Sequence, residues 1–412
     1  MPTLAPDPAS TSLRRQRSFV LFWCARVSAS SAFQMQAVAV GWQIYDLTGS
    51  AFDLGLAGLV QFLPVVGLAL VIGHVADRYD RRLVVRMAQL VEAAAAVCLA
   101  IGSAAAWLDV ETIFALLFVA GTARAFELPT MHALVPGLVP APLFSRAVAG
   151  SASANQVAVV VGPVVGGVLY TAGPAVVYGT CTALFLGASV LVGLIHVEAP
   201  ARSREPFSPA SIFAGVAFIR SRRELVGVIS LDLFVVLLGG AMALLPVYAR
   251  DILLVGPEGL GMLRSAIAVG ALTSSVVLSR HPLRRRVGWI LLSAVTGFGL
   301  ATAVFAVSTS VPLTLAALAL CGASDAVSVV IRFSLVQART PPEMRGRVSS
   351  VESLFAGASN TLGDFEAGVT AAWFGTVPAV LIGGIGSVLV ALLWIRLFPE
   401  LTEIEILDGP RG

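Results

Sequence analysis

The sequence predicts an all-α membrane protein with twelve transmembrane helices in two pseudo-symmetric bundles of six. Three observations predict this class. The chain of 412 residues is 57% hydrophobic and 12% charged. Its apolar segments repeatedly exceed the roughly 18 residues that cross a bilayer, and they are continuously apolar instead of alternating, which excludes a β-barrel. Matching residues also recur in the two halves at a constant offset. Because backbone polar groups in lipid must be satisfied within each segment, the spans are predicted to be helices.

Twelve apolar segments are separated six and six by a polar segment that contains several Pro and Arg residues. The predicted spans are 19–45, 52–76, 83–107, 112–134, 145–171, 174–196, 224–249, 259–280, 287–308, 311–335, 348–373 and 377–398. We predict bundles at 19–196 and 224–398, a cytoplasmic linker at 197–223, and cytoplasmic tails at 1–18 and 399–412. The first span is expected to be a retained signal anchor, since no cleavage site of small residues follows the early arginines.

All 27 basic residues are arginine, and their distribution predicts the orientation. With a cytoplasmic amino terminus, Arg250 is the single arginine in an outer loop, and the positive-inside rule then places both termini in the cytoplasm of a bacterium, with the chain in its inner membrane. The net charge of +3 therefore reflects topology and gives no support to a nucleic-acid partner. Without lysine the chain cannot build a Walker A site or a pyridoxal Schiff base, so we predict no ATP and no cofactor.

The chain shows no pattern of an enzyme or a metal site. Its four cysteines and four histidines are scattered without ligand spacing, and no nucleophile, histidine and acid are grouped. We therefore predict a protein that is not an enzyme and holds no metal.

The two halves match at an offset of 201 residues. The matched pairs are Gly121 with Gly322, Pro140 with Pro341, Arg146 with Arg347, Gly162 with Gly363, and Gly167 with Gly368. Six spans per half in the same orientation form a parallel repeat, which is typical of transporters whose two bundles rock about a site at the bilayer midplane.

The segment "GHVADRYDRR" (73–82) is a charged cluster between two apolar spans. Its residues Gly73, Asp77, Arg78, Arg81 and Arg82 resemble the G-x-x-x-D-R-x-x-R-R signature of the major facilitator superfamily, with Asp80 where many members have glycine. The resemblance implies the major facilitator fold and a cytoplasmic gate, in which this loop holds the bundles together and releases them during transport. The alternative is a short turn that only obeys the charge bias.

Further segments resemble one branch of that superfamily, which contains enterobactin exporters and macrolide-efflux proteins. They include "GTARAFELP" (121–129), "LLPVYARDIL" (244–253) and "PPEMRGRVSSVESLFAGASNTLGDFEAG" (341–368). The segment "GPVVGG" (162–167) resembles a helix 5 motif associated with antiporters. Its residues Gly162, Pro163, Gly166 and Gly167 could form a bendable seam, and plain packing of small residues is the alternative.

Charged side chains within the predicted spans are the candidates for substrate binding and proton coupling. Each costs on the order of 2.5–3.5 kcal/mol at the centre of a spanning helix, so each needs a partner or a wet cavity. The candidates are Arg26, Arg124, Glu127, Asp232, Asp325, Arg332, Glu352, Asp364 and Glu366, with the uncharged Gln34 as a possible hydrogen-bonding group for a substrate.

Family resemblance implies that the first, fourth, seventh and tenth spans line a central cavity. The repeat offset matches Arg124 with Asp325, so we expect basic and acidic groups to oppose each other across the pseudo-twofold axis. A local pair between Arg124 and Glu127, three residues apart, is the alternative. The polar stripe through Glu352 and Glu366 is either a proton path or a polar seam between helices.

These observations predict a secondary active transporter that works by alternating access. We expect a proton-coupled exporter (an antiporter) of a small hydrophobic or amphipathic molecule, such as a siderophore or a drug, that functions as a monomer. The open alternatives are uptake or lipid transport by the same fold and, in another class, a receptor that transports nothing.

Overall fold

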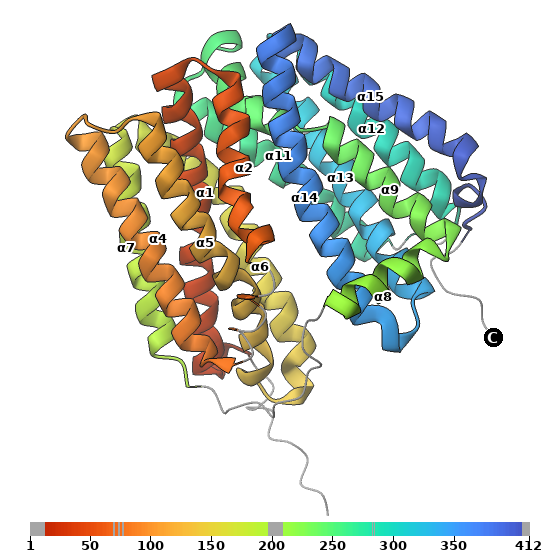
Figure 1. Ribbon diagram of the computed structural model, residues 1–412, viewed down its shortest axis with the longest axis horizontal. Coiled ribbons are helices and arrows are strands. Elements are labelled where there is room, and N and C mark those ends of the chain that lie inside the picture. Colours follow the sequence, from red (N-terminus) through yellow and green to blue (C-terminus); the bar gives the residue numbers. More distant parts are fainter. Residues whose placement is uncertain are drawn as a thin grey trace, which may run out of the picture. The chain divides into compact units, whose positions relative to one another are not determined.

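The computed structural model describes residues 13–68, 71–72, 75, 78–196, 209–281, 283 and 285–405. Within this part of the chain a helix lies at each of the twelve predicted spans (Figure 1). Nine helical segments of the described residues are long and apolar enough to cross a membrane. Three helices at predicted spans lie outside that set: α1 (Arg17–Thr48), α2 (Ala51–Gly67) and α14 (Pro342–Phe374). Both α1 and α14 carry many polar residues, and α2 has only 17 residues.

Local sequence signals explain where the helices of the amino-terminal half begin. This half also contains α4 (Arg81–Ala104), α5 (Val110–Leu134), α6 (Phe144–Tyr170) and α7 (Pro174–Gly193). The carboxylates of Asp80 and Asp109 accept hydrogen bonds from backbone N–H groups in the first turns of α4 and α5, as N-cap residues do. Pro174 opens α7, where its missing N–H costs no hydrogen bond.

The carboxyl-terminal half differs from the prediction at two places. The predicted span 224–249 is interrupted: α9 (Arg223–Leu238) ends with Gly239 as its C-cap residue, and the short η5 (Ala241–Leu244), α10 (Leu245–Val247) and η6 (Tyr248–Ile252) follow. The Gly239–Gly240 pair and Pro246 explain the break, because glycine weakens a helix and proline removes a backbone donor. Within the predicted polar linker, α8 (Pro209–Arg220) forms a helix. The remaining helices are α11 (Gly256–Arg280), α12 (Val287–Val307), α13 (Val311–Arg339) and α15 (Thr376–Leu397).

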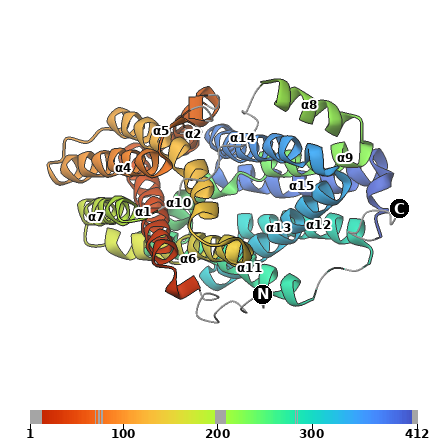
Figure 2. The ribbon, with the colours of Figure 1, turned by 90° about the horizontal axis from the view of Figure 1, so that it is seen from below.

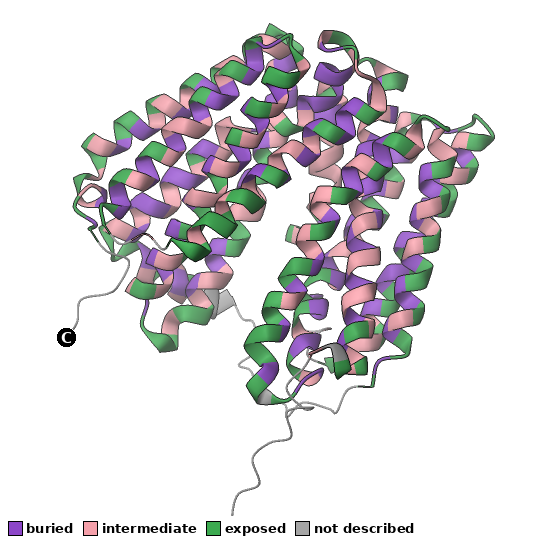
Figure 3. Ribbon diagram, turned by 180° about the vertical axis from the view of Figure 1, so that it is seen from behind, coloured by how far each residue is buried: buried purple, intermediate pink, exposed green. Residues whose placement is uncertain are grey.

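The chain divides into two compact units that do not coincide with its two halves. Residues 41–59, which include the end of α1 and the beginning of α2, belong to the unit that also contains the chain from Ser208 onward. In the first unit α4 packs against both α5 and α7, and Figure 2 shows α4 between these two helices. In the second unit α12 packs against α13 and α15, and α13 packs against α11. Exposed residues recur along each helix in both units, as lipid-facing surfaces require (Figure 3).

Equivalent glycines make equivalent close contacts inside each unit. A Cβ added to Gly121 would lie 2.1 Å from the carbonyl oxygen of Gln61, and one on Gly322 would lie 2.0 Å from that of Ile267. A Cβ on Gly162 would meet Gln34, and one on its repeat partner Gly363 would lie 2.4 Å from the carbonyl oxygen of Val236. The offset of 201 therefore marks matching helix contacts, as an internal repeat predicts.

These contacts give a stability prediction. Gly322→Ala is expected to lower the free energy of unfolding by about 1–3 kcal/mol, because α13 must move away from the Ile267 carbonyl. Gly179→Ala is the matched control: nothing lies within 4 Å of a Cβ there. Alanine favours a helix over glycine by up to about 1 kcal/mol, so the control should be neutral or stabilised. Thermal unfolding in detergent measures both, and equal melting temperatures for the two variants would contradict the close contact.

Candidate functional site

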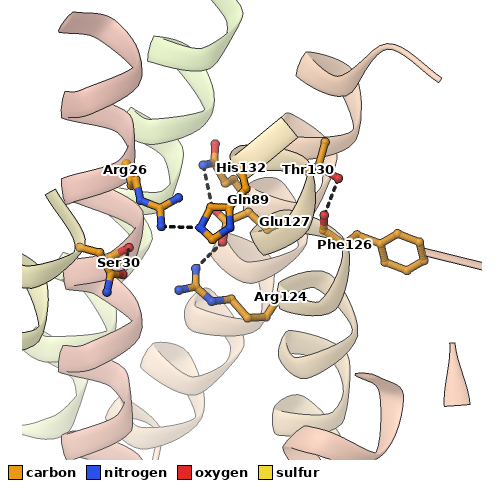
Figure 4. A network of polar contacts seen from close by, with 9 residues as sticks. Arg26, Ser30, Gln89, Arg124, Phe126, Glu127, Thr130 and His132 are labelled. Carbon is orange, nitrogen blue, oxygen red and sulfur yellow. Dashed lines mark hydrogen bonds and ion pairs between the residues drawn. The ribbon is translucent and has the colours of Figure 1, made fainter. Parts of the chain in front are cut away.

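Charged and polar residues of the first unit form a network in which Arg26, Gln89 and Glu127 are buried, Arg124 is half-buried and His132 is exposed (Figure 4). On α5 the guanidinium of Arg124 donates to the carboxylate of Glu127, whose side chain is 1% exposed. The other carboxylate oxygen of Glu127 accepts a hydrogen bond of 2.9 Å from the side-chain amide of Gln89 on α4. Arg124 also lies over the ring of Phe33 on α1, 4.5 Å from its centroid. The local pair that three-residue spacing allows is therefore present, and it is held from two other helices.

Arg26 is the second cation of this network, and it is buried. Its Nη2 lies 2.8 Å from Nε2 of His132, which comes from the last turn of α5. Because a guanidinium only donates hydrogen bonds, this ring nitrogen must accept, so His132 is neutral with its proton on Nδ1. Arg26 forms no ion pair within the described residues, and its Nε is buried without a hydrogen-bond partner. Figure 4 shows Arg26 and His132 facing each other above Arg124.

The second unit contains a buried charge triad made by three helices. Arg332 on α13 lies between two acids: its Nε is 3.3 Å from Oδ1 of Asp232 on α9, and its Nη1 is 2.9 Å from Oε1 of Glu352 on α14. All three residues are at least nine-tenths buried. Asp325, seven residues earlier on α13, is exposed and forms no ion pair with another described residue. One arginine therefore balances two buried carboxylates, with a third acid on the same helix.

The other predicted site residues lie outside these two clusters. Asp364 on α14 interacts electrostatically with Arg264 on α11, and its backbone carbonyl would lie 3.0 Å from a Cβ on Gly55. Glu366 accepts a hydrogen bond of 2.6 Å from Thr370 one turn later. Gln34 packs with its side chain against Gly162. The helix 5 motif lies on α6, which forms the fifth predicted span. Its residues Gly162 and Gly166 contact α1, Pro163 lies within α6, and Gly167 is buried. The bendable seam stays a prediction.

The predicted gate segment is only partly described: Gly73 and Asp77 lie outside the described residues. Arg78 is exposed. Arg81 donates to the carbonyl oxygen of Ala133 at 3.0 Å, and Arg82 to that of Ile195 at 2.9 Å. Both carbonyls follow or end a helix, where cations and donors are favourable. Within the first unit these arginines therefore tie the start of α4 to the ends of α5 and α7, and a role as a gate stays a prediction.

Asp80, the departure from the family signature, is the N-cap of α4, and it gives a pH-dependent prediction. The side-chain hydrogen bond from Arg82 holds the pKa of the Asp80 carboxyl below its ordinary value. A depressed pKa stabilises the fold above the pKa of the unfolded chain and loses that effect as pH falls through the folded value. Asp80→Ala is expected to cost about 0.5–2 kcal/mol at neutral pH. The cost should shrink below about pH 4.

Thermal unfolding at several pH values checks this effect. Asp80→Asn is the matched control, since asparagine keeps the cap and removes the titrating group. A cost for Asp80→Ala that is the same at every pH would show that the carboxylate charge contributes nothing.

Two residues of the first-unit network, Gln89 and His132, were not predicted from the sequence, and neither was Glu92, a buried acid of α4 that interacts electrostatically with Glu127 and Arg124. Glu92 lies within the predicted span 83–107, so its charge alone is a sufficient signal to place it among the candidates for substrate binding and proton coupling. Gln89 and Glu92 lie on one face of α4, three residues apart, and both are buried. His132 lies near a predicted helix end, and sequence offers no signal for its contact with Arg26.

A second set of polar contacts lies at the end of α1, within the second unit. The hydroxyl of Tyr45 donates to the carboxylate of Asp251. Arg250 is 2.9 Å from Oδ1 of Asp46 and donates at 3.1 Å to the carbonyl oxygen of Tyr45. The single arginine predicted for an outer loop is therefore paired, and it attaches the end of α1 to the segment after α10.

Residues 9–408 match the family model for the transmembrane secretion effector, MFS_3. The chain belongs to this family of major facilitator transporters. Curated relatives match it over their length: it is 26% identical over 397 residues to "Enterobactin exporter EntS" of Salmonella choleraesuis, covering 95% of each chain. It is 27% identical to the protein of that name from Citrobacter koseri, covering 95% of this chain and 94% of the relative.

Solved structures show the same fold as this MFS_3 chain. The nucleoside transporter NupG matches with a TM-score of 0.75 at 13% identity, covering 92% of this chain and 99% of NupG. A bacterial homologue of the iron transporter ferroportin matches with a TM-score of 0.68 at 19% identity, covering 93% and 99%. These identities show the fold alone.

The family membership confirms several predictions from sequence. The MFS_3 chain is a multi-pass membrane protein with the major facilitator fold, and it is a transporter of small molecules, not an enzyme. The predicted resemblance to the enterobactin-exporter branch is confirmed by the relatives. Roles for individual residues in substrate or proton binding stay predictions.

Proposed function

We propose that this chain is a proton-coupled exporter of a small amphipathic molecule, with a siderophore of the enterobactin kind as the leading substrate class. The observation that carries the proposal is the similarity to enterobactin exporters over 95% of the chain. Its place is the bacterial inner membrane with both termini in the cytoplasm, and its functional unit is the monomer. The proton gradient, not ATP, drives it.

The buried clusters support proton coupling. Ionisable groups within spanning helices are costly and persist where they move ions or bind substrates. The Asp232–Arg332–Glu352 triad has one more acid than base. Binding a proton to one acid of such a group removes its attraction for the arginine and changes which contacts are favourable. The same cluster therefore has two charge states, as a coupled transporter requires.

The contacts at the end of α1 support alternating access. On the predicted orientation, Tyr45, Asp46, Arg250 and Asp251 lie at the outer end of the helices. Ion pairs and hydrogen bonds at a wet surface have small net free energies, so they can break and re-form in each cycle. We infer that this set closes the outer side of the transporter.

Everted membrane vesicles test direction and energy source together. Export from the cell becomes uptake into such vesicles, so a catecholate siderophore should accumulate when respiration builds a proton gradient, and a protonophore should abolish the accumulation. Vesicles without the protein are the control. Accumulation in right-side-out vesicles only would favour uptake by the same fold, and accumulation that the protonophore leaves unchanged would contradict proton coupling. A protein that binds the siderophore and moves none would be a receptor.

A further inference from the structure

Glu92 is a buried acid that the proposed transport function does not yet use. It lies near the middle of the 24-residue α4, on the face formed by the buried residues of that helix. Its side chain is 2% exposed. Both of its carboxylate oxygens are buried, and neither has a hydrogen-bond partner in the described part of the chain. An ionised carboxylate accepts hydrogen bonds only, and burying one without any donor is among the costliest arrangements in a protein.

The donors around Glu92 are already engaged. Arg124 donates to Glu127, and the amide N–H of Gln89 donates to the other oxygen of Glu127. Arg26 of α1 and His132 of α5 contact each other. On α7, which packs against α4, the thiol of Cys181 donates to the carbonyl of Ala32, and Tyr178 is buried. Arg86 on α4 lies against Gly193, and Glu111 is exposed in the first turn of α5. The charges that act on Glu92 are those of Glu127 and Arg124.

A single proton on Glu92 would give a hydrogen-bond partner to two buried groups that lack one. The side-chain oxygen of Gln89 is also buried without a hydrogen-bond partner. Residues three apart on a helix lie on the same face, so a protonated Glu92 can donate to this oxygen. The hydrogen bonds then run from the Glu92 O–H to the Gln89 amide, from that amide to Glu127, and from Arg124 to Glu127. Figure 4 shows the hydrogen bonds of this series that join Gln89, Glu127 and Arg124.

We propose that Glu92 is a proton-binding residue of the first unit, and that Gln89 and Glu127 connect its protonation to Arg124. On release, the O–H bond of Glu92 breaks and the proton passes to water. The electron pair stays on the carboxylate, which then competes with Glu127 for Arg124. Because Arg124 also lies over Phe33 of α1, its change of partner reaches a helix that family resemblance places at the central cavity. This inference rests on the proposed proton coupling and names a carboxyl group for it.

Infrared spectroscopy of the purified protein in nanodiscs tests the proton directly. The carbonyl stretch of a protonated carboxyl is distinct from the carboxylate bands and shifts in heavy water. The difference between wild type and Glu92→Gln at neutral pH should contain this band. Glu111→Gln, at an exposed position in the first turn of α5, is the matched control and should show no such loss. A folded Glu92→Gln protein with no loss of the band would overturn the inference.

Transport by the same variants tests its role. Glutamine keeps the size of the side chain and an N–H donor for Gln89, so Glu92→Gln should fold and should exchange labelled for unlabelled substrate without a gradient. Accumulation driven by an imposed pH gradient should fall to the passive level, whereas Glu111→Gln should accumulate as wild type does. Wild-type accumulation in Glu92→Gln would overturn the role. If wild type itself ignores the gradient, the proposed coupling fails, and the infrared band alone then decides whether Glu92 holds a proton.

Discussion

Replacing Arg332 by glutamine is expected to destabilise the protein by about 3–5 kcal/mol and to abolish export, because two buried carboxylates lose their shared cation. Asp232 and Glu352 lie 3.3 Å and 2.9 Å from Arg332, and no other described arginine pairs with either. Thermal unfolding in detergent gives the stability, and export per molecule of protein in the membrane gives the activity.

Two control variants separate the charge from the fold. Removing all three charges, in Asp232→Asn with Arg332→Gln and Glu352→Gln, should restore much of the stability without restoring export, since no buried charge is left unpaired. Arg339, on the same helix as Arg332, forms a partly exposed pair with Glu224 of α9. Arg339→Gln breaks this pair and should cost at most about 1 kcal/mol. An Arg332→Gln protein that unfolds and exports as wild type does would show that the triad has neither role.

Replacing Asp325 by asparagine is expected to reduce gradient-driven accumulation to the passive level with little change in stability. Asp325 is exposed and outside the ion pairs of the triad, so its loss leaves no buried charge unpaired. Asparagine resembles a permanently protonated aspartate, which removes the change of charge that coupling needs. Accumulation under an imposed pH gradient should therefore fail, whereas exchange of substrate without a gradient should continue.

Asp109→Asn is the matched control for this variant. It makes the same chemical change at the N-cap of α5, where asparagine caps as well as aspartate does. The control should accumulate substrate as wild type does. Full active transport in both Asp325→Asn and Asp232→Asn would remove these two residues from the coupling mechanism.

Hydropathy predicts most of this fold because lipid leaves the chain few alternatives. Each of the twelve predicted spans contains a helix, since an apolar segment in a bilayer must satisfy its own backbone. The break after Leu238 could not be located from hydropathy, because the whole segment is apolar and the interruption depends on Gly239 and Gly240 meeting neighbouring side chains and backbone. The helix α8 was not predicted, because it lies in a segment whose composition is that of a linker.

The sequence predicts which kinds of residue belong to the candidate site, and it does not predict which residues of different helices pair with each other. A charge in a span is costly wherever it lies, so the cost alone identifies Arg124, Arg332 and Glu352 as candidates. The pair of Arg124 with Glu127 follows from spacing on one helix. The Asp232–Arg332–Glu352 triad joins three helices, and no local pattern contains that information. Opposition of Arg124 and Asp325 across the repeat stays a prediction.

Proton movement driven by substrate tests the central claim most directly. Purified protein is placed in proteoliposomes that contain a pH-sensitive dye, with a siderophore gradient as the only energy source. Downhill movement of the siderophore should then drive protons in the opposite direction, so the internal pH should change in wild type and stay constant in Asp325→Asn and Glu92→Gln. Siderophore movement through the wild-type protein without any change in internal pH would contradict proton-coupled export.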